Sequence, residues 1–298
     1  MKKLPFVLSI LLLAGAVRGD DAAAKRATDC REFRDQLATD KSLIRYYTFE
    51  DEGQDVPNLG GDKRGELILS LKSPYFNADL HPGQNTDYTR WTEGRFVGKP
   101  ALSFGAVRDS ATRSMFYGTP SGVLTLEAWV RPHESAGGKA EAILFSVGSG
   151  FGDGWLLKAT SSETSLRIGR PQKDGGDAEL SVKPLAGHVW HQVVAVIEHQ
   201  TLRLYVDGEL AGTKEFTGGF IQPTAPGGYF AQCPEDARGG LKIGSIGNLN
   251  NTLRFDCDEL AVYDRALTPE DVLAHFKSGQ PSESAADQEV AHRALLEK

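Results

Sequence analysis

The chain has 298 residues and a formal net charge of −7, and its basic residues are spread along the sequence rather than clustered. This length suits one large domain with short appendages, or at most two domains. The acidic balance argues against nucleic acid or anionic lipid as a partner. With 33 glycines and 14 prolines but only 2 methionines, the chain is rich in turn formers and poor in helix formers, as all-β domains tend to be.

The N-terminus has the pattern of a secretory signal peptide. Lys2 and Lys3 precede an apolar run over residues 4–17, which Arg18 closes. The run is too short to cross about 30 Å of hydrocarbon at about 1.5 Å per residue, but it fits a signal-peptide core. We expect residues 1–19 to be removed and the mature chain to be secreted or held in the periplasm or cell envelope, without membrane insertion. The alternative is an uncleaved amphipathic anchor.

A leader over residues 20–42 follows, and it contains one predicted helix. Asp29 and Glu32 have the spacing of a capped helix start. Phe33 and Leu37 are four residues apart and therefore share one helix face. The pattern predicts a short helix that lays one apolar edge on a larger body.

The rest of the chain alternates as β-strands do. Leu202, Leu204 and Val206 share one strand face, and Asp207-Gly208 then supplies two residues able to adopt positive φ in a tight hairpin. A second turn is expected at 198–200. Long loops around a short strand at 65–71 are expected between residues 54 and 92. Further predicted strands lie at residues 43–49, 124–132, 142–146, 154–158, 165–170, 178–182 and 190–197.

Four separate stretches resemble one family. They read FVGKPALSF at 96–104, LTLEAWVRP at 124–132, WHQVVAVI with TLRLYVDGEL at 190–210, and FDCDELAVYDRAL at 255–267. In this order they resemble the laminin-G-like domain, a concanavalin A-type jelly roll. The resemblance implies an all-β fold over residues 43–279, a two-sheet antiparallel jelly-roll sandwich with short accessory helices. It leaves the activity open, because lectins, adhesion modules and glycan-cleaving enzymes share this scaffold.

A helix is predicted directly after the last of these stretches. Thr268 has the character of a cap residue, Pro269 stands at the first helical position, and Asp271 supplies an acid at the third. The helix is expected to run to about Lys277, with Gly279 able to end it. Residues 280–298 form a polar tail.

The acidic residues do not have the pattern of a hydrolase. The glucan-cleaving enzymes to which this fold is similar carry their acids on a strand with the pattern E-x-D-x-E. Retaining glycosidases hold two carboxyl groups about 5–5.5 Å apart. Here Asp256 and Asp258 share a strand face, but Leu260 stands where the next acid is needed. Glu127 is interpreted as a solvated strand residue. We therefore expect no enzyme, but an exported, non-catalytic binding module for a glycan, such as a polysaccharide, or an extracellular protein.

Two other functions stay open at this point. One is a diverged glycoside hydrolase or polysaccharide lyase on the same fold. The other is a structural or sensory component of the cell envelope with no small ligand.

Sugar-binding sites combine aromatic faces with amide and carboxylate hydrogen-bonding groups. Glycine-rich loops and turns of this chain carry such residues, and the ligand-binding candidates are Phe151, Trp155, Tyr229, Gln232, Asn248 and Asn250. The alternative for each aromatic residue is that it anchors its loop to the sandwich. Trp129 and Trp190 lie in the family-like stretches and are expected to belong to the framework.

One carboxylate is a candidate ligand of a structural Ca²⁺. By strict alternation, Asp258 shares a strand face with Leu260 and Val262, and a buried carboxylate needs donors or a cation. In jelly rolls of this kind the first and last strands lie side by side, which would bring Asp51 near Asp258. Carboxylate oxygens with loop carbonyls suit Ca²⁺. The alternative is that Asp258 accepts backbone N–H bonds or pairs with an arginine such as Arg45.

Three cysteines in an exported chain leave one over if a disulfide forms. Cys233 and Cys257 enclose about 25 residues, and a bridge there would contribute about 3 kcal/mol. This pair is the predicted disulfide. The alternative is that Cys257 is a buried thiol, because the family has an aliphatic residue at its position. Cys30 could pair with either cysteine or stay free.

Overall fold

The computed structural model describes residues 25, 28–50, 55–61, 67–68, 90–96, 98–104, 112–114, 119, 121–133, 141–147, 154–169, 176–218, 241–244 and 253–281. Within these ranges, no helix is long and apolar enough to span a membrane.

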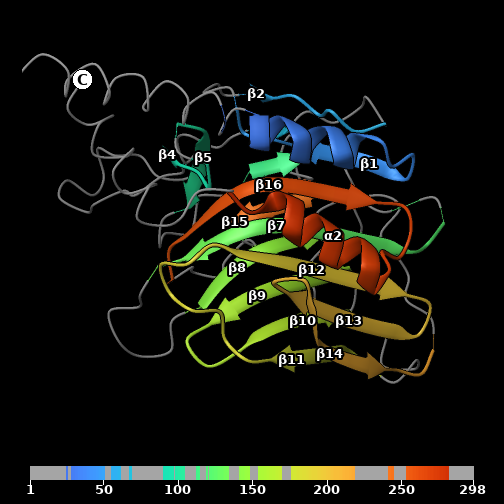
Figure 1. Cartoon of the computed structure of the whole chain (residues 1–298). Helices are drawn as coiled ribbons and strands as arrows, with labels where there is room; N and C mark the ends of the chain where they lie inside the picture. The colour runs from blue at the N-terminus through green and yellow to red at the C-terminus, as the bar shows by residue number, and fades with distance from the viewer. Residues whose placement is uncertain are drawn as a thin grey trace, which may run out of the picture.

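Two antiparallel sheets form the body of the protein, as predicted (Figure 1). The first sheet has the order β14-β13-β12-β7-β16-β5-β4, and β1 also pairs with β16. The second has the order β11-β10-β9-β8-β15-β6-β3-β2. The strands are β1 (Leu43–Tyr47), β2 (Asp55–Val56), β3 (Leu67–Ile68), β4 (Arg90–Glu93), β5 (Pro100–Phe104), β6 (Thr112–Ser114), β7 (Leu124–Pro132), β8 (Glu141–Val147), β9 (Trp155–Thr160), β10 (Thr164–Ile168), β11 (Ala178–Val182), β12 (His191–Glu198), β13 (Thr201–Val206), β14 (Glu209–Glu215), β15 (Leu241–Gly244) and β16 (Phe255–Tyr263).

Two tight turns fix the register of the hairpins in the first sheet. Asp207 and Gly208 have φ values of 52° and 81°, so both adopt the left-handed conformation that the predicted β13–β14 turn requires. The β12–β13 turn places His199 at φ 50°. The resulting register sets Ala195 opposite Leu204, and the leucine side chains of β13 point into the sandwich.

The space between the sheets holds the main hydrophobic core. Residues of the central strands enter it, including Leu126 and Val130 from β7 and Phe145 and Leu157 from the second sheet. The first and last strands lie side by side, as the resemblance implied, with Tyr47 opposite Leu260. This inner face of the first sheet is therefore apolar along its length.

Two helices cover the outer face of the first sheet, and both were predicted. One spans residues 28–38, and its Phe33 and Leu37 are buried against the sheet. The other is α2 (Pro269–Gly279), which begins with Thr268 as N-cap and a reciprocal capping box with Asp271. Figure 1 shows both helices lying across the same side of the sandwich.

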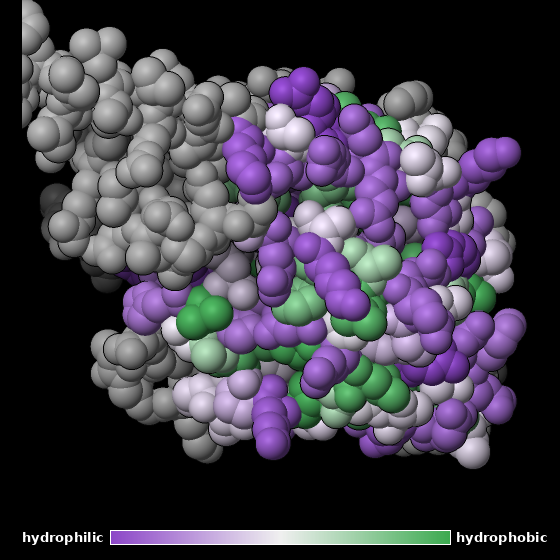
Figure 2. All heavy atoms as spheres, viewed as in Figure 1, coloured by the Kyte–Doolittle hydropathy of each residue, from purple (hydrophilic) through white to green (hydrophobic). Residues whose placement is uncertain are grey.

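The surface over these helices is mainly polar, with some apolar side chains left exposed. Figure 2 shows hydrophilic residues over most of this face and hydrophobic residues gathered among them. Leu273 of α2 and Leu210 of β14 are 38% and 53% exposed. Gly208 lies against Leu273 and Phe276, and an added Cβ would come within 3.0–3.2 Å of those side chains, so the turn itself supports α2.

Candidate functional site

Most of the residues that the sequence singled out for a site fall outside the described residues. These are Asp51, Phe151, Tyr229, Gln232, Cys233, Asn248 and Asn250. Trp155, Cys257 and Asp258 are described.

Trp155 is wrong as a ligand-binding residue. Its side chain is 1% exposed and lies in the core between the sheets, at the start of β9. A sugar needs an accessible aromatic face to stack on. Trp155 therefore anchors its strand, which was the alternative interpretation.

Cys257 is a free thiol in this structure, and Cys233, its predicted disulfide partner, lies outside the described residues. Its side chain points into the core between the sheets and is fully buried, among the aliphatic and aromatic residues of both sheets. Burial raises the pKa of this thiol well above its ordinary value. Cys30 is also free and buried, and burial raises its pKa to about 12.

Asp258 points to the outer face of the sheet rather than toward the core, which corrects the expected strand face. A β-bulge at Glu259 is the reason: Asp258 pairs with Trp129 and Leu260 with the adjacent Ala128, so Glu259 is the extra residue. Glu259 has φ 58°. Strict alternation fails at such a bulge, and two acids in succession face the helices.

Buried nitrogen atoms surround the Asp258 carboxylate. Lys99 Nζ contacts Oδ1, and the Arg95 backbone N–H donates to Oδ2 at 2.9 Å. Lys99 Nζ also lies 3.2 Å from Glu259 Oε1. Both oxygens of Asp258 thus have protein donors, and the ammonium stands where a Ca²⁺ would have to lie, so these residues do not fit a calcium ion. Asp51, the other expected ligand, lies outside the described ranges.

The charged groups of this cluster shift one another's pKa values. Burial alone would lower the pKa of Lys99, but Asp258 and Glu259 raise it above its ordinary value. Burial raises the pKa of Glu259, while Lys99 opposes that shift. The group is held as an ion-paired set inside the protein.

The Arg95 side chain lies in a cage of three aromatic rings next to this cluster. Its guanidinium carbon lies 4.8 Å from the ring centre of Phe33, 4.6 Å from Phe96 and 4.1 Å from Trp129. The side-chain nitrogens have no hydrogen-bond acceptor among the described residues. Three rings therefore hold this cation by their faces. Since Phe33 belongs to the helix over 28–38, the cage ties that helix to the sheet.

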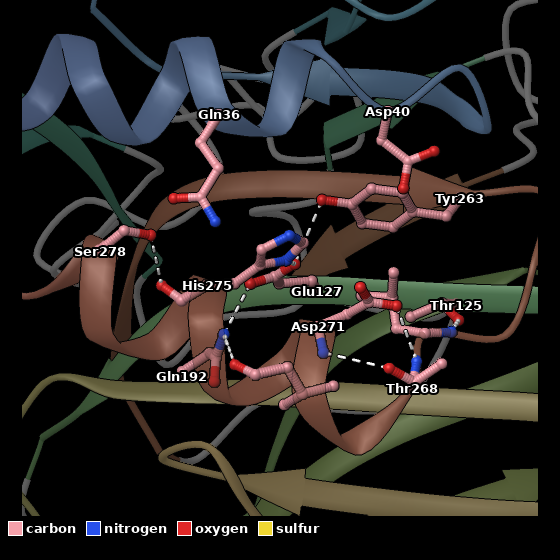
Figure 3. Close-up of polar contacts among 12 residues, drawn as sticks. Gln36, Asp40, Thr125, Glu127, Gln192, Tyr263, Thr268, Asp271, His275 and Ser278 are labelled. Atoms are coloured by element: carbon pink, nitrogen blue, oxygen red, sulfur yellow. Dashed lines mark hydrogen bonds and ion pairs between the residues drawn. The ribbon is translucent and has the colours of Figure 1, made fainter.

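A second buried polar cluster lies beneath α2, around Glu127 (Figure 3). Gln192 Nε2 donates to Glu127 Oε1 at 2.6 Å, and His275 Nδ1 and the Tyr263 hydroxyl lie 2.8 and 3.2 Å from Oε2. Glu127 is 2% exposed, so its interpretation as a solvated residue is wrong. Burial alone would lower the pKa of His275, but its contact with Glu127 raises it.

Arg265 joins the two helices at the surface. Its Nε donates to Asp40 Oδ2 at 2.9 Å, just after the helix over 28–38, and its Nη1 donates to Asp271 Oδ2 at 2.6 Å, in the first turn of α2. The two helices and the sheet are thus linked by ion pairs as well as by apolar packing.

The outer face is more open at the end of the sheet where β7 ends and β12 and β16 begin. The register sets Gln192 opposite Trp129, so Trp190 comes beside Arg131 two residues further along, on the same face of the sheet. Asp256 lies opposite Arg131 on one side and Ser103 on the other. Trp190, Arg131, Asp256 and Ser103 therefore form one row across four neighbouring chain segments, which we call the outer row.

Contacts within the outer row fix its side chains. The Arg131 guanidinium lies 4.7 Å above the Trp190 ring, and Arg131 Nε donates to Asp256 Oδ2 at 2.7 Å. His133 Nε2 lies 2.9 Å from the same oxygen. The carboxylate is 1% exposed, whereas the side chains of Arg131 and His133 are 27% and 33% exposed.

Asp256 is held as an anion. Burial alone would raise its pKa, but hydrogen bonds from His133 and Ser103 and the charge of Arg131 lower it below the ordinary value. The row thus presents a half-buried indole, a fixed guanidinium and an imidazole on a partly open surface. Such a combination can stack on and hydrogen-bond a polar ligand.

Comparison with known proteins identifies the family. A family model described as the concanavalin A-like lectin/glucanases superfamily matches residues 108–273, which is more than half of the chain. The chain belongs to the concanavalin A-like lectin/glucanases superfamily.

Solved structures of toxin binding domains share this superfamily fold. The binding domain of Paraclostridial Mosquitocidal Protein 1 is 14% identical, with a TM-score of 0.55, over 80% of this chain and 52% of that one. The botulinum neurotoxin serotype D binding domain is 11% identical, with a TM-score of 0.55 and the same two coverages. A botulinum neurotoxin type C structure, whose cell entry depends on two ganglioside molecules, is 11% identical, with a TM-score of 0.56 over 82% and 53%. The chain spans about half the length of these proteins.

Sequence reasoning missed the outer row. Arg131 and Trp190 each stand at an end of a stretch typical of the superfamily, and Trp190 was assigned to the framework. Their proximity follows only from the pairing of β7 with β12. One signal in the sequence was that Arg131 and Trp190 each lie near an end of a predicted strand, but it did not show that these two strands pair.

Proposed function

We propose that this protein is an exported, non-catalytic module that binds a glycan. The observation that carries the proposal is the outer row, in which Trp190, Arg131 and His133 lie together on a partly exposed surface around the buried Asp256. Aromatic rings beside fixed polar groups are the usual means by which proteins hold sugars.

The placement of the carboxylates supports a non-catalytic role. Glycoside hydrolysis requires two carboxyl groups that reach the bond to be cleaved. Asp256 and Asp258 face the same side, but Asp258 is 0% exposed and ion-paired with Lys99. Glu127 and Glu259 are both 2% exposed beneath the helices. None of these four described acids offers an open pair to a substrate.

The similar solved structures are consistent with this proposal at the level of the fold. They are described as binding domains, and one is of a toxin whose cell entry depends on gangliosides. Glycan binding by the present chain rests on its own outer row. Export rests on the apolar run over residues 4–17, and N-terminal sequencing of secreted or periplasmic protein should find Val17 or Asp20 as the first residue.

A glycan array probed with the purified mature protein, with and without Ca²⁺, tests the function. We expect binding to a subset of glycans, no release of reducing ends from them, and the same result in either condition. Release of reducing ends would favour a hydrolase instead. Absence of binding to any glycan would leave an extracellular protein as the partner and reject the proposal.

A further inference from the structure

A lysine and an aspartate that touch each other inside the protein have the arrangement of reactants for an amide. Lys99 directly precedes β5, and Asp258 lies on β16, the strand that pairs with β5. Lys99 Nζ contacts Asp258 Oδ1, and the two side chains are 6% and 0% exposed. The fold therefore holds an amine against a carboxyl group, and such fixed proximity strongly accelerates the reaction of two groups.

Burial favours the amide over the ion pair. In water an ammonium and a carboxylate are both well hydrated, but inside a protein each has lost that hydration. An amide carries no net charge, so its formation removes the cost of keeping two buried ions. The amide N–H also keeps an acceptor, because Lys99 Nζ already donates to the Thr48 carbonyl at 2.6 Å.

A backbone donor is aimed at the oxygen on which charge develops. The Arg95 N–H donates to Asp258 Oδ2 at 2.9 Å. When an amine attacks the carboxyl carbon, negative charge builds up on the oxygen that stays bound to that carbon. A fixed N–H at this oxygen stabilises the transition state, as an oxyanion hole does in acyl transfer.

Glu259 is placed to move protons between the two reactants. It is the extra residue of the bulge next to Asp258, and its Oε1 lies 3.2 Å from Lys99 Nζ. The two carboxylates raise the pKa of Lys99, so the ammonium predominates at rest, whereas burial raises the pKa of Glu259 and makes it a better proton acceptor. Because the bond forms only once in each molecule, a small fraction of neutral amine is sufficient.

We propose that Lys99 and Asp258 form an intramolecular isopeptide bond, with Glu259 as the proton carrier. Lys99 Nζ gives a proton to Glu259 and attacks Cγ of Asp258, so that a C–N bond forms. Glu259 relays two protons in succession from Nζ to Oδ1, the Cγ–Oδ1 bond breaks, and Oδ1 leaves as water. One ammonium and one carboxylate thus become one amide and one water molecule, and no oxidant or other reactant is needed.

This bond joins two residues that are 159 positions apart in the sequence. It ties β16 covalently to the start of β5, its neighbour in the first sheet. The proposal is independent of glycan binding, because the outer row contains neither reacting group.

Mass spectrometry of the purified protein under denaturing conditions tests the proposal. We expect a mass that is lower, by one water molecule, than the sequence from the measured N-terminus gives. Trypsin should release a branched peptide that joins residues 96–108 to residues 255–265. Lys158 is the internal control, because it lies 3.5 Å from Glu179 in a more exposed pair, and its peptides should be unbranched.

Two variants test the roles of the residues. Lys99→Met removes the amine and should have the full mass of its sequence. Glu259→Gln keeps both reacting groups but cannot carry the proton, so most of the freshly made protein should have its full mass. Glu179→Gln should be cross-linked like the wild type. Circular dichroism shows which variants are folded, and Glu259→Gln serves alone if Lys99→Met does not fold.

Three results would contradict the proposal. A wild type with the full mass of its sequence would overturn it. Loss of water without a branched peptide would also overturn it, because an aspartyl succinimide loses the same mass. Complete cross-linking in folded Glu259→Gln would overturn the role of Glu259 as the proton carrier.

Discussion

The two faces of the first sheet bury very different side chains. The inner face meets the second sheet through aliphatic and aromatic residues, whereas the outer face meets two helices through a smaller apolar cluster together with buried polar groups such as Glu127, Lys99 and Asp258. Apolar packing tolerates small changes because no atom needs a particular partner. Buried charges do not, since a lost partner leaves an uncompensated group. Polar contacts therefore add to apolar packing in fixing the position of the helices, whereas the larger inner core is held by apolar packing.

The largest expected effect comes from Lys99→Met. This change leaves Asp258 and Glu259 buried beside each other without their cation, and breaking a buried pair costs about 3–5 kcal/mol. Urea unfolding measures the loss. The control is Lys158→Met, because Lys158 is 20% exposed and pairs with Glu179 at 3.5 Å on the surface, where a pair contributes less than about 1 kcal/mol. Similar losses in the two variants would contradict the special importance of the buried ion pairs on the outer face. Adding Asp258→Asn to Lys99→Met should cost less than the sum of the single changes.

Phe33→Ala should cost about 3 kcal/mol. Phe33 is 1% exposed and forms one wall of the Arg95 cage, so the change removes apolar packing and a cation–π contact together. Thermal unfolding followed by circular dichroism would show it. Leu210→Ala is the control, since Leu210 is 53% exposed and its removal should change stability by no more than about 0.5 kcal/mol. An equally small effect of Phe33→Ala would mean that the helix over 28–38 is not part of the cooperative fold.

Glu127→Gln should cost about 1–3 kcal/mol, because it removes the charged partner of His275. The loss should also depend on pH. Glu127 raises the pKa of His275 above its ordinary value, so their contact stabilises the fold fully below the unfolded-state pKa of about 6.5 and less as the pH rises through the folded-state pKa. The stability difference between wild type and variant should therefore be larger at about pH 6 than at about pH 9.

The pH control uses a surface pair. Glu198→Gln removes the partner of Arg203, which does not titrate in this range, and its stability difference should stay constant. A Glu127→Gln difference that grew with pH would show that the histidine is not held in its charged form.

The smallest expected effects on the melting temperature are those of a reducing agent and of EDTA. Reducing agent should leave the melting temperature unchanged, because Cys257 is a free thiol inside the core. EDTA should do the same, because Lys99 and the Arg95 N–H already occupy the Asp258 oxygens. A lower melting temperature in EDTA would reveal a stabilising metal ion elsewhere in the chain.

Local sequence patterns predicted the strands and turns of this fold but not what covers them. The extents of β7 and β13, the Asp207-Gly208 turn and the Thr268 cap all follow from neighbouring residues. Glu127 has the same local pattern as a solvated strand residue, and only the distant α2 makes it buried. Two-residue alternation likewise cannot reveal the bulge at Glu259, which changes the face of Asp258.

The candidate site was harder to predict for the same reason. The loops chosen from composition, such as those around Tyr229 and Asn248, carry suitable residue types but lie outside the described residues. The outer row arises where β12, β7, β16 and β5 come into register, and its members are far apart in the sequence. Strand pairing of this kind depends on the whole sheet.

The position of β16 has a consequence for how the protein is made. It is the last strand among the described residues, yet it lies inside the first sheet and pairs with β7, β5 and β1. During synthesis, each of these three strands keeps an unpaired edge until residues 255–263 have left the ribosome. Contacts between such distant parts of a chain form slowly. The first sheet can therefore be completed only after β16 has emerged, and a nascent chain that ends before Phe255 has no complete first sheet.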